Sequence, residues 1–381
     1  MDRNLWLYPR YAAARNLLFW LPVFFLYFQQ SLSLSEALWL EAVYYAAFVV
    51  LEVPSGYASD RMGRRATLVT GASLSAMGAA LFAAGDSLEV WALGQLLFAA
   101  GYAFDSGTDS SLLYDTLAAM GRETEFRARE SRASSASLWA VAISSLLGGL
   151  LGAVDLRLAY VATALCVGAS ALLAASFAEP PRRRAEGARA QGKKVLQALI
   201  QPVIAWTLCA AVAGTVLNHV PYEFLQPWLA GLVGDMGRTP VWSGSISFVI
   251  VGIGAMAAAR ADTLAGLLGA TRAVTGALAL QVVIIASMGS LVSPWLIPLL
   301  ALRGVPGALA RPILGSMQHP LLDSDIRATT LSVQSLLGRM SFGLSLLIAG
   351  WFATDGLPPL LFGYAALGAA MVAGLVASAP R

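Results

Sequence analysis

Twelve apolar runs, each about long enough to cross a bilayer, restrict this chain to the fold class of all-α integral membrane proteins. A helix needs about 20 predominantly apolar residues to span the hydrocarbon core. Of the 381 residues, 57% are hydrophobic and only 12% are charged, against about 25% charged residues in a soluble domain. The predicted membrane helices cover residues of about 15–33, 36–56, 66–85, 90–116, 134–154, 158–177, 200–229, 241–260, 272–290, 294–316, 328–352 and 359–378.

The basic residues predict how these helices are oriented. Twelve spans put both termini on one side of the membrane, and almost every arginine and lysine between the spans falls on that same side. Only Arg157 and Arg238 fall in loops on the other side. Because cytoplasmic loops carry the excess of basic residues, we expect both termini to be cytoplasmic in a multi-pass protein of the inner (plasma) membrane.

The longest polar interruption divides the spans into two groups of six. It predicts an N-terminal six-helix bundle over residues 1–178, a basic cytoplasmic linker over 179–199 and a C-terminal six-helix bundle over 200–381. A shift of 195 positions aligns RASSAS, which begins at Arg132, with RATTLS, which begins at Arg327. Together with the six-plus-six pattern, this match favours duplication of one bundle, a common construction of secondary transporters.

Several function classes find no support in the composition. The net charge is only +3, so no nucleic-acid partner is expected. Cys166 and Cys209 lie in apolar runs, and His219 and His319 are the only histidines. We therefore expect no metal site, no catalytic triad and no cofactor. A non-transporting membrane receptor or scaffold remains an alternative of another class, because it would share every feature except the chemistry of a cavity.

The stretch PSGYASDRMGRR, residues 54–65, places a cluster of charged residues between the second and third apolar runs. It resembles the G-x-x-x-D-R-x-G-R-R loop between helices 2 and 3 of major facilitator superfamily transporters, and the chain looks like a poorly characterised bacterial branch of that family. The resemblance implies two pseudo-symmetric six-helix bundles that alternate access to a central cavity. It also implies that Asp60 contacts helix 11 and that Arg64 or Arg65 reaches Asp115 on helix 4. The expected conformational latch comprises Glu52, Gly56, Asp60, Arg61, Gly63, Arg64, Arg65 and Asp115.

The residue types in this loop suit a latch for physical reasons. Glycines permit tight turns and close approach of helices, aspartate interacts with the positive N-terminal end of a helix, and arginine pairs with carboxylates. The simpler alternative is that the charges only anchor the loop among lipid headgroups.

Asp105 and Asp109 are the first candidates for a transport cavity. With Thr108, they share one face of the fourth predicted helix near the middle of the membrane. A carboxylate at this depth without a close cation could bind and release protons. The alternative is that one aspartate caps a helix break around Ser106 and Gly107, or that both lie in a wet vestibule.

Other ionisable residues inside predicted spans complete the candidate set, because charge at bilayer depth usually faces a bundle interior or a wet cavity. Arg303 and Arg339 lie where snorkelling to a surface is difficult, so each needs an anionic partner, either Asp105 or Asp109 or an anionic substrate. Arg311 lies nearer the cytoplasm and is interpreted as structural. The remaining candidates are Glu41, His219 and Glu223.

These features predict a secondary active transporter that moves a small organic solute by alternating access and is coupled to protons. Efflux by antiport is slightly favoured, with proton-coupled uptake of a nutrient or an organic anion as the alternative. The fifth predicted helix contains Gly148, Gly149 and Gly152 but lacks the Gly-Pro step of family antiporters. The expected partners are a small-molecule substrate, protons and the lipid bilayer, and the family expectation is a monomer.

Overall fold

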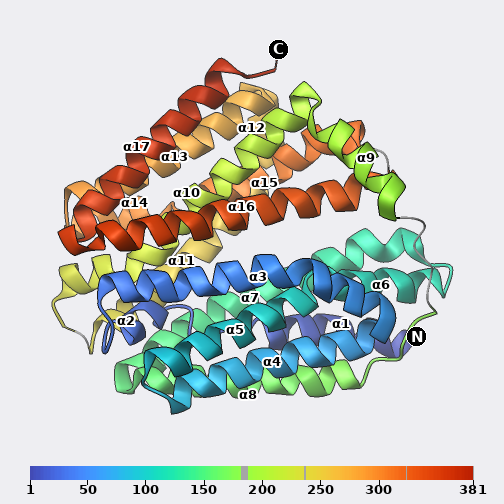
Figure 1. Cartoon of the computed structure of the whole chain (residues 1–381), viewed down its shortest axis with the longest axis horizontal. Helices are drawn as coiled ribbons and strands as arrows, with labels where there is room; N and C mark the ends of the chain where they lie inside the picture. The colour runs from blue at the N-terminus through green and yellow to red at the C-terminus, as the bar shows by residue number, and fades with distance from the viewer. Residues whose placement is uncertain (182–187, 236, 323, 381) are drawn as a thin grey trace. The chain divides into compact units, whose positions relative to one another are not determined.

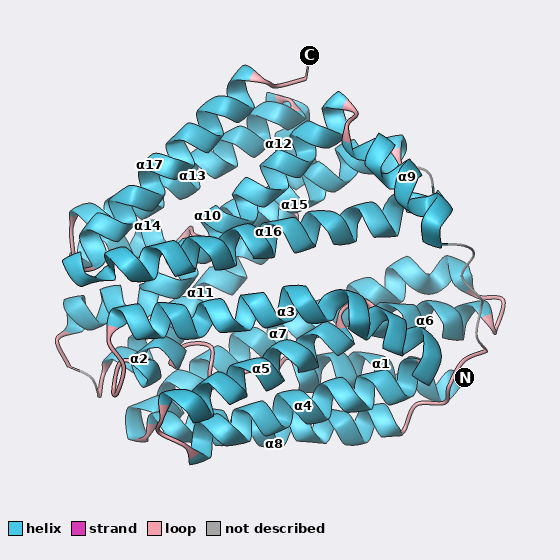
Figure 2. Ribbon diagram, viewed as in Figure 1, coloured by secondary structure: helices cyan, strands magenta, loops and turns pink. Residues whose placement is uncertain are grey.

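The computed structural model describes the chain except residues 182–187, 236, 323 and 381, and except the side chains of residues 60, 188–193, 319, 324–325, 327–328 and 355. Every regular element among the described residues is a helix (Figures 1 and 2). The chain divides into two compact units, residues 1–184 with 235–248 and residues 185–234 with 249–381.

Unit 1 contains the first six membrane segments. Its helices are α1 (Asp2–Arg15), α2 (Phe24–Phe28), α3 (Leu34–Met62), α4 (Arg64–Ala84), α5 (Leu88–Asp105), α6 (Thr108–Ala118), α7 (Phe126–Val154) and α8 (Leu156–Ala175). Short 3-10 turns connect some elements, as at Glu123–Glu125.

Unit 2 contains the other six membrane segments, preceded by the linker helix α9. Its helices are α9 (Ala188–Leu199), α10 (Pro202–Val233), α11 (Thr239–Ala258), α12 (Ala261–Leu268), α13 (Ala270–Ser290), α14 (Ile297–Ala301), α15 (Gly304–Gln318), α16 (Ser324–Phe352) and α17 (Leu357–Ala377). The first half of α11, up to Phe248, groups with unit 1.

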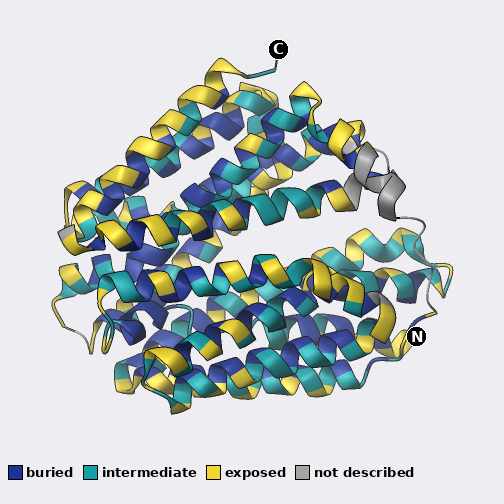
Figure 3. Ribbon diagram, viewed as in Figure 1, coloured by how far each residue is buried: buried dark blue, intermediate teal, exposed yellow. Residues whose placement is uncertain are grey.

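Ten helical segments of the described chain, with Pro294–Gln318 counted as one, are long and apolar enough to cross a membrane. The two other predicted crossings are the first and the fourth, and each is divided into two shorter helices, α1 with α2 and α5 with α6. The prediction of an all-α membrane protein built from two six-helix bundles is confirmed. Many large apolar side chains are exposed in each unit, and Figure 3 colours the ribbon by how far each residue is buried.

The first crossing differs from the sequence prediction of one helix over 15–33. Helix α1 begins at Asp2 and ends at Arg15, and residues 16–23 are irregular before α2 begins. The irregular stretch contains Pro22, and a residue before proline is disfavoured in α-helical conformation. Gly148 of α7 makes room for this stretch, because a Cβ there would lie 2.0 Å from the carbonyl oxygen of Phe19.

The fourth and tenth crossings are interrupted at equivalent positions. Helix α5 ends at Asp105, Gly107 adopts a left-handed φ of 71°, and α6 begins at Thr108. In unit 2, residues 302–303 separate α14 from α15. Adding the repeat shift of 195 to 107 gives 302, so the two interruptions coincide under the shift that aligns the two arginine-containing motifs. The helix break around Ser106 and Gly107, one of the alternatives for this segment, is present in the structure.

Candidate functional site

A buried ion pair joins the two interrupted crossings of unit 1. The Nε atom of Arg15 lies 2.9 Å from Oδ1 of Asp105, and only 14% and 4% of the two side chains are exposed. Arg15 is the last residue of α1 and Asp105 is the last residue of α5. A cation is favourable at a helix C-terminus, whereas a carboxylate is not, so Arg15 offsets the unfavourable position of Asp105.

Tyrosines complete the surroundings of this pair. The buried hydroxyl of Tyr11 donates a hydrogen bond to Oδ1 of Asp105, and the guanidinium of Arg15 lies 5.1 Å from the centre of the Tyr102 ring. Asp109, in the first turn of α6, interacts electrostatically with Arg15 as well. One cation, Arg15, therefore interacts with two carboxylates, which suits a site where protonation changes the charge balance.

The structure gives Asp105 a partner that the sequence analysis did not consider. Arg303 and Arg339 were the expected cations, while Arg15 was counted among the cytoplasmic arginines. Arg15 follows Tyr11 by four positions, so both side chains lie on one face of α1 and both contact Asp105. That spacing was the available signal, but the predicted helix began at Arg15 and therefore hid it.

Unit 2 contains an arrangement of opposite polarity. Glu223 of α10 is fully buried and interacts electrostatically with Arg303, which lies in the interruption between α14 and α15. The Arg303 guanidinium lies 5.6 Å from the centre of the Tyr222 ring, and its buried Nε has no hydrogen-bond partner among the described residues. In unit 1 the first crossing of the bundle supplies the cation, and in unit 2 the first crossing supplies the carboxylate.

A cavity of about 500 Å³ lies within unit 2 between α10, α15 and α16. Its charged lining residues are Arg311 and Arg339, and His219 also lines it. Nδ1 of His219 lies 2.7 Å from the carbonyl oxygen of Thr215, and its ring packs against Phe342 with the centroids 4.8 Å apart. The uncharged polar lining residues are Thr215, Asn218, Gln318, Gln334 and Ser335.

Three ionisable residues named in the sequence analysis line this cavity. His219 and Arg339 were predicted to belong to a cavity, whereas Arg311 was interpreted as structural. Arg311 lines the same cavity as Arg339. The Nε2 atom of Gln318 donates hydrogen bonds to Thr207 Oγ1 at 2.9 Å and to Gln334 Oε1 at 2.7 Å, so these bonds orient the Gln318 and Gln334 side chains in the lining.

Glu41 lies where α3 packs on α5. It is 7% exposed, and its Oε1 accepts a hydrogen bond of 2.7 Å from Nε2 of Gln95. Nearby, the ring of Tyr44 contacts those of Phe48 and Tyr102. Glu41, one of the candidates named from the sequence, is therefore packed inside unit 1.

The loop between α3 and α4 contains the contact that the family resemblance implied. Nε of Arg64 lies 3.4 Å from Oδ2 of Asp115 on α6, and Nη1 of Arg64 donates to Ser59 Oγ at 2.8 Å. Arg65 is exposed. The guanidinium of Arg61 lies 4.6 Å from the centre of the Tyr57 ring.

The remaining residues of the predicted latch lie in different environments. Gly63 has a φ of 97°, a conformation in which a side chain is strained, so the α3–α4 turn requires glycine. A Cβ on Gly56 would meet no atom within 4 Å, so close helix approach does not explain that residue here. Glu52 is half-buried on α3, and the Asp60 side chain lies outside the described part of the structure.

Glu179, which was not among the candidates from the sequence, lies beside the loop between α3 and α4. The backbone N–H groups of Arg64 and Arg65 donate to Oε1 and Oε2 of Glu179, at 2.7 and 2.9 Å. These are first-turn donors of α4, which no intrahelical carbonyl can satisfy. Glu179 therefore caps α4 from the segment after α8, and the charge of its carboxylate complements the helix dipole.

Comparisons with known proteins agree with this architecture. The family model described as Major Facilitator Superfamily matches residues 10–340. No curated protein matches the chain in sequence. The solved structure of the nucleoside transporter NupG, as its D323A mutant, is similar with a TM-score of 0.83 and 12% identity, covering 99% of this chain and 100% of that one.

Two further solved structures share the fold. The D-xylose-proton symporter has a TM-score of 0.76 at 14% identity and covers 98% of this chain and 97% of that one. An auto-inhibited POT family peptide transporter has a TM-score of 0.70 at 14% identity and covers 100% and 97%. The family match spans most of the described helices of both units, and the chain therefore belongs to the major facilitator superfamily of transporters.

Proposed function

We propose that this transporter moves a small organic anion and couples its movement to protons. The observation that carries the proposal is the cavity of unit 2, where Arg311 and Arg339 are the charged residues of the lining. Guanidinium groups bind carboxylate and phosphate oxygens through paired hydrogen bonds, and a volume of about 500 Å³ falls in the usual range for small-molecule sites.

The polar residues of the lining support the same substrate class. Asn218, Gln334 and Ser335 can donate or accept hydrogen bonds, whereas the two guanidiniums only donate. An anion with additional hydroxyl or amide groups matches such a wall better than an amphipathic cation does. The proposal therefore departs from the drug cations that family efflux pumps export and follows the organic-anion alternative.

The ion pair of unit 1 supports proton coupling. The Asp105 carboxylate can either pair with Arg15 or bind a proton. Protonation removes the negative charge that attracts the guanidinium. Protonation therefore weakens the contact between α1 and α5, the two helices that end at this point. A change of contact that depends on proton binding is what coupling requires, because a ligand shifts an equilibrium only by binding two states differently.

The proposal includes the membrane setting predicted from sequence: an inner-membrane monomer with both termini in the cytoplasm. The direction of transport has two candidates. One similar structure is of a proton symporter for D-xylose, which favours uptake, and the sequence analysis slightly favoured export in exchange for protons. The two directions differ in the sign of the proton flux that accompanies the solute.

The test is transport in proteoliposomes that contain a pH-sensitive dye, with an imposed proton gradient. Small organic anions are compared with neutral sugars, nucleosides and amphipathic cations. We expect proton flux that depends on an anion, an increase in KM of at least roughly tenfold in Arg339→Gln and Arg311→Gln, and no change in Arg272→Gln, an exposed control in the same unit.

The Asp105→Asn variant tests coupling separately from binding. We expect it to bind the anion but to lose solute-dependent proton flux. Transport of cations or neutral solutes alone would contradict the anion assignment. Proton-coupled anion transport that persists in Asp105→Asn would contradict the role of Asp105 while leaving the cavity assignment intact.

A further inference from the structure

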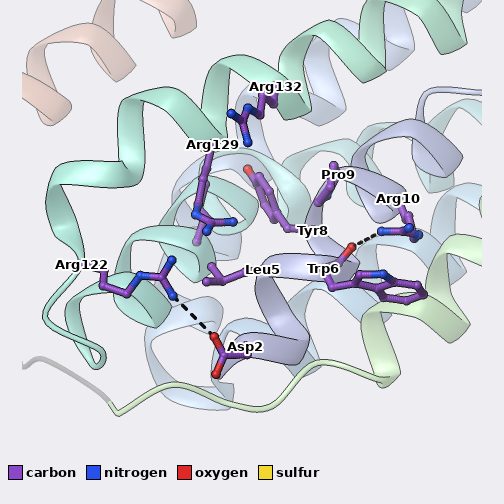
Figure 4. A pocket seen from close by; sticks show the side chains of 10 residues that line it. Asp2, Leu5, Trp6, Tyr8, Pro9, Arg10, Arg122, Arg129 and Arg132 are labelled. Carbon is purple, nitrogen blue, oxygen red and sulfur yellow. Dashed lines mark hydrogen bonds and ion pairs between the residues drawn. The ribbon is translucent and has the colours of Figure 1, made fainter.

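A second pocket, of about 430 Å³, lies in unit 1 between α1 and the start of α7, away from the Arg15–Asp105 pair. Figure 4 shows Arg122, Arg129 and Arg132 on the α7 side, facing the N-terminal half of α1 with Leu5 and Tyr8. Nothing in the proposed transport mechanism uses this concentration of arginine.

The guanidiniums of this pocket are only partly neutralised. Arg122 lies 3.5 Å from Asp2 and 2.6 Å from Glu125, and Arg129 shares Glu125 at 2.8 Å. Arg132 makes no hydrogen bond or ion pair with another described residue. The pocket therefore has an exposed guanidinium, that of Arg132, without a carboxylate partner among the described residues, next to Arg122 and Arg129, which share Glu125, with Asp2 as a second partner of Arg122.

The length of α7 indicates where the pocket lies relative to the hydrocarbon core of the membrane. Helix α7 has 29 residues, which is about 44 Å at about 1.5 Å per residue, whereas the hydrocarbon core is about 30 Å thick. The surplus includes the charged first turns, with Arg129 and Arg132, because charge is costly inside the core. These arginines then lie at the level of the lipid headgroups, on the side predicted to be cytoplasmic.

The α1 side of the pocket suits the same level. Trp6 is 58% exposed, and the Arg10 guanidinium lies 3.6 Å from the centre of its ring. Tryptophan concentrates at membrane interfaces because its ring is apolar and its N–H is polar. Leu5, Pro9 and Leu113 add apolar lining, so the pocket combines a basic end with an apolar surface.

We propose that this pocket binds the phosphate of an anionic phospholipid, with Arg132 and Arg129 as its main ligands and the glycerol region of the lipid against the apolar side of α1. Basic pockets between helices on the cytoplasmic side are suited to such headgroups. A soluble phosphate ester has the same anionic group but would not use the apolar surface. The bound lipid would connect the N-terminal half of α1 to α7.

The experiment measures lipid binding by native mass spectrometry of the full-length protein in neutral detergent. The probe is dioctanoyl phosphatidylglycerol, with dioctanoyl phosphatidylcholine as the neutral lipid and glycerol 3-phosphate as the soluble competitor. The test variant is Arg132→Gln, which breaks no hydrogen bond or ion pair with a described residue. The matched control is Arg127→Gln, an equally exposed arginine of α7 outside the pocket.

We expect phosphatidylglycerol to bind more tightly than phosphatidylcholine and to lose roughly fivefold or more in affinity in Arg132→Gln. Arg127→Gln should bind as the wild type does, and glycerol 3-phosphate should not displace the lipid at equal concentration. Equal weakening in both variants, or none in Arg132→Gln, would overturn the site. Complete displacement by glycerol 3-phosphate would overturn the lipid assignment in favour of a soluble phosphate ester.

Discussion

The Nε atom of Arg15 lies 2.9 Å from Oδ1 of Asp105, so that the ends of α1 and α5 are joined by a nearly buried ion pair. Removing one partner of a buried pair leaves an uncompensated charge, which costs about 3–5 kcal/mol. Removing both leaves no charge to compensate. The stability of the single and double variants therefore measures how strongly this contact holds unit 1 together.

We expect Asp105→Asn to lower the free energy of unfolding by about 3–5 kcal/mol and Arg15→Gln to lower it less. The asymmetry arises because a carboxyl without its cation can take up a proton, whereas a guanidinium cannot lose one. The double variant should be more stable than Asp105→Asn. Chemical unfolding in detergent measures all three.

The control for this cycle is Asp86→Asn. Asp86 pairs with Arg157 at 3.5 Å, but its side chain is 77% exposed, and exposed pairs contribute about 0–1 kcal/mol. If Asp105→Asn were as mild as this control, the Arg15–Asp105 pair would not be a buried contact of the folded protein.

The sequence predicted the architecture well because its signal is repeated over long segments. The twelve apolar runs required no tertiary information, and the long described helices occupy most of those runs. The prediction was poorest for α1. Its residues 2–15 include Asp2, Arg3, Arg10 and Arg15, which resemble a polar terminus, although Asn4 and Tyr11 are buried in the bundle.

The site was harder to predict because its contacts join distant segments. Glu179 and Arg64 are 115 positions apart, and no local pattern distinguishes a capping carboxylate from any other loop residue. Arg311 was placed by depth alone, although the face of α15 on which it lies depends on where that helix begins, after the break at residues 302–303. The Arg64–Asp115 contact was anticipated only through the family motif.

The contact between Arg64 and Asp115 should control the rate of the conformational cycle. If it is a latch that breaks in one state, Asp115→Asn and Arg64→Gln each change the rate at saturating substrate severalfold and leave KM nearly unchanged. The double variant should resemble the single variants, because all three lack one interaction. Initial rates in proteoliposomes test this.

Arg65→Gln is the matched control, since Arg65 is exposed and adjacent to Arg64 but its side chain makes no hydrogen bond or ion pair with another described residue. We expect it to transport at the wild-type rate. Equal effects of the Arg64 and Arg65 substitutions would argue for a general role of positive charge at the headgroups, the simpler alternative for this loop.

Glu179 should stabilise the start of α4. Glu179→Ala removes both acceptors of the Arg64 and Arg65 N–H groups, and loss of a helix cap costs about 1 kcal/mol. Glu179→Gln keeps one oxygen and should lose less. Thermal unfolding in detergent compares them with Glu123→Ala, whose side chain makes no hydrogen bond or ion pair with a described residue; equal stability of Glu179→Ala and this control would contradict the cap.

The close approach of α7 to the first half of α11 depends on glycine. A Cβ on Gly149 would lie 2.4 Å from the carbonyl oxygen of Pro240, and one on Gly244 would lie 2.5 Å from that of Ser145. Backbone atoms cannot yield as the end of a side chain can, so Gly149→Ala must separate the two helices. We expect a loss of about 1–3 kcal/mol, as for overpacked cores, and slower transport. Gly276→Ala on α13, where a Cβ meets no atom within 4 Å, should show neither effect. Wild-type stability in Gly149→Ala would mean that α7 and α11 do not approach this closely in the membrane.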